Sequence, residues 1–162
     1  MEKNRRLIHV WAGIPLPDQE MGEVRVKVKL TNAADEALAE AGHLAVDGVR
    51  TIVVDALVDT GAVDTGAVRS VIPANIKQQL GLKAAFQTKA RCAAGRTEDV
   101  EVTTPIDMEL EGRPLYEECL VLGDEVLIGQ TALEKTDLFV DCIHGKLVPN
   151  PEHPNSVVMP VR

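Results

Sequence analysis

Two adjacent copies of one short motif contain the residues of this chain best suited to chemistry. Asp59-Thr60-Gly61-Ala62-Val63 is followed directly by Asp64-Thr65-Gly66-Ala67-Val68. In each copy a carboxylate precedes a hydroxyl that can hydrogen-bond neighbouring backbone and a glycine that permits a tight turn. A carboxylate held beside a partner group is suited to general acid–base work. The candidate catalytic residues are therefore Asp59 and Asp64, and the residues that would support them in their loops are Thr60, Gly61, Ala62, Thr65, Gly66 and Ala67.

The flanking sequence predicts what positions this repeat. Residues 49–58 are apolar and rich in β-branched side chains, which indicates a buried strand that ends at the first Asp. The second copy is followed after two residues by Ser70-Val71-Ile72. Both copies are thus expected at the end of a rigid strand.

A second motif lies further along the chain. It consists of Val126-Leu127-Ile128-Gly129 followed by Gln130-Thr131-Ala132-Leu133. A short helix is predicted over residues 131–136, directly after the glycine motif. Apolar segments at 138–141 and 145–149 then predict a closing hairpin. In order and spacing, residues 22 to 150 resemble the retropepsin-like aspartic proteases, the single-domain family that includes the retroviral proteases.

This resemblance implies a fold and a mechanism. The expected fold is mainly β: a retropepsin-like closed β-barrel or sandwich with a flap hairpin and one or two short helices, assembled as a homodimer. Each subunit would supply one Asp, and the two carboxylates would share a proton. The implied reaction is the hydrolysis of a polypeptide by an activated water, an aspartic endopeptidase activity that needs no metal and no cofactor.

The resemblance also assigns substrate-binding residues. A hairpin is predicted over residues 86–104, and the resemblance makes it the flap that closes over substrate, with Ala93, Ala94, Gly95 and Arg96 at its tip. The walls of the substrate pocket would include Val71, Ile72 and Ile128, together with Val63 or Val68. These apolar walls predict an extended peptide with hydrophobic side chains beside the cleaved bond.

The repeat departs from the family pattern. The preceding strand favours Asp59 as the catalytic residue, whereas the following Ser70-Val71-Ile72 favours Asp64. A shift of five residues would exchange the two faces of a strand, so the extra copy is expected to loop out, with a slight preference for Asp59. Two other functions stay open: a catalytically inactive dimer that serves as a binding or assembly module, and a cation-binding loop, for which the dense oxygen ligands of a calcium site are missing.

Composition narrows the class of protein further. The chain has 162 residues, of which 45% are hydrophobic, enough for one domain with a core. A net charge of -8 argues against nucleic acid or an anionic membrane as the partner. No segment has the length and apolar character of a membrane span or a signal peptide. The expected location is therefore the cytoplasm.

Cysteines and histidines give no metal-ligand spacing. The cysteines Cys92, Cys119 and Cys142 are odd in number and are interpreted as small buried hydrophobes, although Cys92 near the hairpin tip is a candidate for oxidation. The four histidines are scattered along the chain, so no metal site is predicted.

The remaining segments complete the expected domain. Residues 1–20 form an N-terminal extension, 21–150 the protease domain and 151–162 a C-terminal tail whose residues 156–159 resemble a strand. Alternating apolar residues from Glu23 predict a half-buried strand, followed by a helix over 33–41 with Asn32 as its cap and Gly42 past its end. A second helix is expected to begin with Pro73 at its first position and to run to Gly81. Further strands are expected at 102–110, 116–122 and 126–128.

Overall fold

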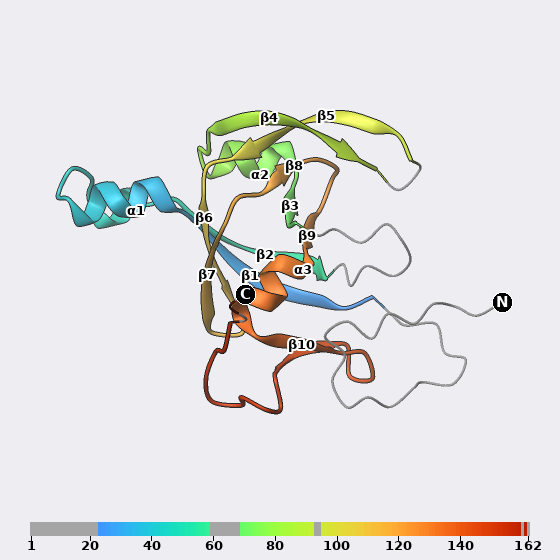
Figure 1. Cartoon of the computed structure of the whole chain (residues 1–162). Coiled ribbons are helices and arrows are strands. Elements are labelled where there is room, and N and C mark those ends of the chain that lie inside the picture. Colours follow the sequence, from blue (N-terminus) through green and yellow to red (C-terminus); the bar gives the residue numbers. More distant parts are fainter. Residues whose placement is uncertain (1–22, 59–68, 93–94, 160, 162) are drawn as a thin grey trace.

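The computed structural model describes residues 23–58, 69–92, 95–159 and 161. Most of this part of the chain forms one curled sheet of nine strands, in the order β4-β5-β8-β3-β9-β2-β1-β6-β7 (Figure 1). The strands of this sheet are β1 (Arg25–Asn32), β2 (Thr51–Val58), β3 (Val71–Ile72), β4 (Ala84–Arg91), β5 (Thr97–Thr103), β6 (Ile106–Leu110), β7 (Arg113–Glu117), β8 (Leu120–Val121) and β9 (Val126–Ile128).

The fold is mainly β, as the sequence predicts, but the sheet is a half-barrel rather than a closed barrel. Over the described residues its two edges are β4 and β7, which do not pair with each other. The described part contains helices at the three places where the sequence predicts them, one more than the family resemblance implies: α1 (Ala33–Glu40), α2 (Ala74–Gln79) and α3 (Gln130–Thr136). It also contains one 3₁₀ turn, η1 (Val46–Gly48).

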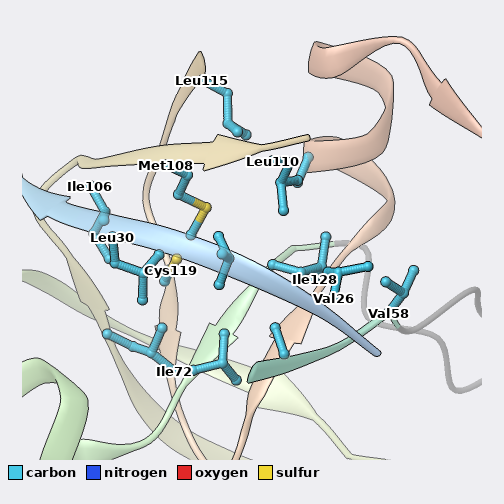
Figure 2. Packing of buried hydrophobic residues seen from close by; sticks show 14 of the residues in the cluster. Val26, Leu30, Val58, Ile72, Ile106, Met108, Leu110, Leu115, Cys119 and Ile128 are labelled. Carbon is cyan, nitrogen blue, oxygen red and sulfur yellow. The ribbon is translucent and has the colours of Figure 1, made fainter. Parts of the chain in front are cut away.

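Strand β1 forms the centre of the core. It pairs antiparallel with β2 on one side and with β6 on the other. Its inward residues Val26, Val28 and Leu30 are buried, while the intervening charged residues face outward, which confirms the predicted alternation. Figure 2 shows labelled side chains of β1, β6 and β9 pointing into the same interior. Among the described residues, this cluster is made of aliphatic side chains together with Met108 and Cys119, and it contains no aromatic side chain.

Helix α1 begins and ends where the sequence predicts. The side chain of Asn32 accepts hydrogen bonds from the backbone N–H groups of Ala34 and Asp35, 2.9 and 3.1 Å away. Gly42 follows the helix with a φ of 79°, a conformation that favours glycine. The helix α1 and turn η1 together project from the sheet (Figure 1).

Helix α2 differs from the prediction by one position. Pro73 is its N-cap, with extended backbone, rather than its first helical residue. The helix ends as expected, since Leu80 is its C-cap and Gly81 follows with a φ of 62°.

A long hairpin confirms the expectation for residues 86–104. Strands β4 and β5 pair antiparallel, and the turn between them is held by a hydrogen bond from the Cys92 N–H to the Arg96 carbonyl. Most of β4 is solvent-exposed, so this hairpin extends beyond the core. A single cross-strand ion pair, Lys89 to Asp99 at 2.7 Å, joins its outer part.

Two predicted strands, at 102–110 and 116–122, are each split in the structure. The first is interrupted at Thr104-Pro105, because β5 pairs with β4 and β8 whereas β6 pairs with β1 and β7. Proline has no N–H group with which to continue a ladder. The second is interrupted at residues 118–119, where the chain leaves the edge strand β7 and crosses to β8, beside β3.

The C-terminal part forms a small separate sheet. Strands β10 (Leu138–Asp141) and β11 (Lys146–Pro149) pair antiparallel, which confirms the predicted closing hairpin. Residues 156–159 form no strand. The Asp137 carboxylate instead binds this segment by accepting a hydrogen bond from the Val158 N–H, 3.2 Å away.

Within the described ranges, no helix has the length and apolar composition needed to cross a membrane. The N-terminal extension, residues 1–20, lies outside them.

Candidate active site

Three strand ends meet at one place in the large sheet. Strand β2 runs parallel to β9, with Val58 opposite Ile128, and β3 runs antiparallel on the other side of β9, with Val71 opposite Leu127. The end of β2, the end of β9 and the start of β3 are therefore neighbours. Residues 59–68 connect the first of these ends to the last, so the repeat leaves and re-enters the sheet on either side of the Ile128-Gly129 turn.

The repeat itself lies outside the described residues. This applies to both candidate catalytic residues, Asp59 and Asp64, and to Thr60, Gly61, Ala62, Thr65, Gly66 and Ala67. At the hairpin tip, Ala93 and Ala94 also lie outside, whereas Gly95 and Arg96 are described and exposed. Gly95 has a φ of 74°, which suits it to the turn.

Gly129, the residue directly after β9, has no space for a side chain. A Cβ atom on Gly129 would lie 2.5 Å from the backbone carbon of Arg69 and 2.8 Å from the Ser70 nitrogen. Its φ of -88° is ordinary, so steric exclusion rather than backbone conformation selects glycine here. The Ile-Gly motif thus allows the chain that returns from the repeat to lie directly against the start of α3.

A buried polar network joins the same two segments. The Ser70 hydroxyl donates to Glu117 Oε2 at 2.6 Å and accepts from the Gly129 N–H at 3.1 Å. The Thr131 hydroxyl donates to the other carboxylate oxygen, Glu117 Oε1. We call these four residues, Ser70, Glu117, Gly129 and Thr131, the Glu117 network.

Most of the Glu117 network is buried from solvent, and its carboxylate also lies near the ammonium group of Lys135. Ser70 is completely buried, and the Glu117 side chain is only 4% exposed. Lys135 Nζ lies 3.7 Å from Glu117 Oε1 and donates to the Tyr116 carbonyl. A shallow pocket adjoins the network, and it is lined by Arg69, Pro105, Tyr116, Glu117, Glu118, Thr131 and Lys135.

The predicted pocket residues occupy the interior. Ile72 and Ile128 are completely buried members of the core cluster, and Val71 is 5% exposed. They support the strands that carry the site, while their contact with substrate stays a prediction.

The cysteines have different environments. Cys119 is buried in the core, and burial with the nearby Glu117 charge raises the pKa of its thiol. Cys142 is partly buried, and burial likewise raises the pKa of its thiol. Cys92 lies at the hairpin turn with intermediate exposure. All three thiols are free.

Two carboxylate–histidine pairs lie in the C-terminal part of the described chain. Asp141 binds His144, and Asp137 binds His153. Among the described residues no three or more His, Cys, Asp or Glu side chains are arranged to hold a metal ion.

The sequence interpretation missed the role of Glu117. Side chains alternate between the two faces of a strand, so Leu115 and Glu117 lie on the same face of β7, and Leu115 is buried. This alternation indicates from the sequence that Glu117 faces inward. A carboxylate on the inward face of a strand needs a partner, which indicates a buried network. Ser70 was interpreted only as the residue before an apolar pair, and Thr131 only as the start of a helix.

No protein-family model matches this chain, and no curated protein matches it.

Proposed function

We propose that this chain is a retropepsin-like aspartic endopeptidase that acts as a homodimer. The observation that carries the proposal is the arrangement of β2, β9 and β3 around the Ile128-Gly129 turn. This arrangement places Val58 and Arg69, the residues on either side of the Asp-Thr-Gly repeat, next to Ile128 and Gly129 respectively. Two anchored flanks of this kind support a loop that presents a carboxylate.

The mechanism requires two copies of the loop. Across a two-fold axis the same surface of each subunit meets its equivalent, so two such carboxylates would face each other. Two carboxylates within hydrogen-bonding distance share one proton, because ionising both is costly. One would act as the general base that activates water, while the protonated one polarises the peptide carbonyl and then protonates the leaving nitrogen.

Asp59 is the proposed catalytic residue of each subunit. It directly follows Val58, the last residue of β2, which pairs with Ile128 and whose N–H donates to the Val24 carbonyl. The strand that leads into Asp59 is therefore held on both sides up to its last residue. The second copy, Asp64, would then belong to the additional loop.

The hairpin of β4 and β5 is the proposed flap. Its exposure, its length and the glycine in its turn support closure over a bound peptide, which would exclude water from the site. The proposed substrate is an extended polypeptide with hydrophobic side chains flanking the cleaved bond.

Cleavage of a peptide library, with and without a transition-state analogue of aspartic proteases, tests this function. The expected result is cleavage that the analogue abolishes and a metal chelator leaves unchanged. Folded protein that cleaves no peptide but binds one would instead favour the inactive binding module. Cleavage mainly beside charged residues would contradict the proposed specificity.

A further inference from the structure

The Glu117 network joins parts of the sheet that its strand order separates. Ser70 directly precedes β3, whereas Glu117 ends β7, and four strands lie between β3 and β7 in the sheet. Their side chains nevertheless meet at 2.6 Å. The contact is possible because the chain after Glu117 crosses to β8, which pairs with β3.

The two oxygens of the Glu117 carboxylate bind different segments. Oε2 accepts a hydrogen bond from Ser70, which with Arg69 forms the return segment, the residues between the repeat and β3. Oε1 accepts a hydrogen bond from Thr131 in the first turn of α3. A hydrogen bond to an ionised acceptor is stronger than one between neutral groups. One buried carboxylate thus connects the return segment to the helix.

Ser70 also binds the residue that follows β9 and the first residue of β8. Its hydroxyl accepts from the Gly129 N–H, and its backbone carbonyl accepts from the Leu120 N–H at 3.1 Å. The return segment is therefore fixed on both sides, against β9 and against β8. A buried network of this kind is costly when one member is missing, because the remaining polar groups lose their partners.

We infer that Glu117 and Thr131 are positioning residues, whose buried hydrogen bonds hold the return segment, Arg69 and Ser70, against the Ile128-Gly129 turn. This inference builds on the proposed function, because Ser70 belongs to the segment that returns from the repeat in which the proposed catalytic Asp59 lies. Neither residue touches the reacting atoms in this account. Their loss should therefore reduce turnover more than substrate binding.

Two identical substitutions in α3 separate positioning from general stability. Thr131→Val removes the hydroxyl that binds Glu117, and Thr136→Val removes a buried hydroxyl that binds the Ala132 carbonyl within the same helix. For Thr131→Val we expect faster amide exchange at Gly129 and Leu120, and a kcat lowered about tenfold or more with little change in KM, because small displacements of a catalytic group reduce turnover strongly. Thr136→Val should leave amide exchange at Gly129, kcat and KM unchanged. Thr131→Ser keeps the hydroxyl that binds Glu117, so its exchange and kcat should match those of the unaltered protein.

A second pair of variants addresses the carboxylate itself. Glu117→Gln keeps the size of the side chain but removes its charge, whereas Glu109→Gln makes the same change at an exposed position of β6. The Glu117 variant should show the exchange and kcat changes, and the Glu109 variant should not. If Thr131→Val does not fold, this second pair decides the question.

Two results would overturn the inference. One is unchanged exchange at Gly129 in both Thr131→Val and Glu117→Gln, and the other is a kcat loss no larger than in the matched controls. If the unaltered protein cleaves no peptide, the proposed function fails, and exchange at Gly129 and Leu120 alone decides whether the network holds the return segment.

Discussion

At the scale of single residues, Gly129 is in close contact with backbone. A Cβ atom at this position would lie only 2.5 and 2.7 Å from the carbonyl carbon and oxygen of Arg69, and backbone atoms cannot move aside as a flexible side chain can. The return from the repeat therefore depends on the absence of a side chain at this position.

Gly129→Ala should destabilise the protein by about 1–3 kcal/mol, the usual range for overpacking a well-packed site. Urea unfolding would measure this change. Gly48→Ala is the matched control, because the Cβ there would meet the Leu44 side chain, which can rotate away. Equal stability losses in the two variants would contradict the account of Gly129.

A second residue-scale feature is the ion pair between Asp35 and Arg50. The buried Asp35 carboxylate accepts from Arg50 Nε at 2.8 Å and from Nη2 at 2.9 Å. It also accepts from the Arg50 backbone N–H. The hydrogen bonds from the Arg50 side chain lower the pKa of Asp35, although burial opposes this.

A lowered carboxyl pKa predicts a specific pH dependence. The stabilisation by ionised Asp35 is fully present above the pKa of the unfolded chain, near 3.8, and is lost as pH falls through the lower folded pKa. Asp35→Asn should therefore cost on the order of 1 kcal/mol near neutral pH, a modest value because half of the Arg50 side chain is exposed. The cost should shrink in strong acid.

Urea unfolding of both proteins at several pH values tests this prediction. Asp55→Asn serves as the control, since the Asp55 pair with Lys27 is exposed on both sides and is expected to contribute little at any pH. A stability difference for Asp35→Asn that stays constant from neutral to strongly acidic pH would refute the assignment.

At the scale of elements, the C-terminal segment is held by one side chain. The Asp137 carboxylate accepts from Asn150 Nδ2 at 3.0 Å, bonds His153 Nδ1 at 2.8 Å and accepts from the Val158 N–H. Burial opposes its ionisation, but these hydrogen bonds together lower the pKa of Asp137. Asp137 itself follows α3 in the left-handed conformation, with a φ of 53°.

Asp137→Asn should release residues 150–158 while the sheet stays folded. Asparagine tolerates the left-handed conformation, so the substitution mainly removes the charge that the segment binds. We expect faster amide exchange at Val158 and unchanged exchange in β1. Asp124→Asn, on the exposed turn before β9, is the control, and protection of Val158 in both variants would count against the tether.

The elements also show how far sequence alone reaches. Local signals located β1, α1 and the β4–β5 hairpin, because alternation, a capping Asn and a turn glycine act over a few residues. The breaks at Thr104-Pro105 and at residues 118–119 depend on which distant strands each segment pairs with. The alternation of β7 indicates that Glu117 faces inward, but no local pattern indicates that its partner is Ser70, 47 residues away.

At the scale of the whole molecule, the proposed reaction needs two catalytic Asp residues, of which each chain would supply one. We therefore predict that the active species is a dimer. Activity should fall faster than linearly on dilution, and equilibrium sedimentation should show a dimer under the assay conditions. Full activity in a strictly monomeric species would exclude the shared-proton mechanism.

A shorter Asp repeat is predicted to leave the protein folded and active. Deleting residues 63–67 joins Asp59-Thr60-Gly61-Ala62 directly to Val68, which restores an uninterrupted family pattern. The shortened protein should fold and be at least as active as the parent, because a shorter loop costs less entropy to order. A folded but inactive deletion variant beside an active parent would show that the repeat is part of the working site.

The most direct test of the central claim compares peptide cleavage by Asp59→Asn and Asp64→Asn. An amide cannot act as the general base or share the proton, so Asp59→Asn should abolish cleavage while the protein keeps its fold and its dimer. Asp64→Asn should retain most of the activity. Loss of activity only in Asp64→Asn would move the catalytic residue to the second copy, and undiminished cleavage by both variants would contradict an aspartic protease mechanism.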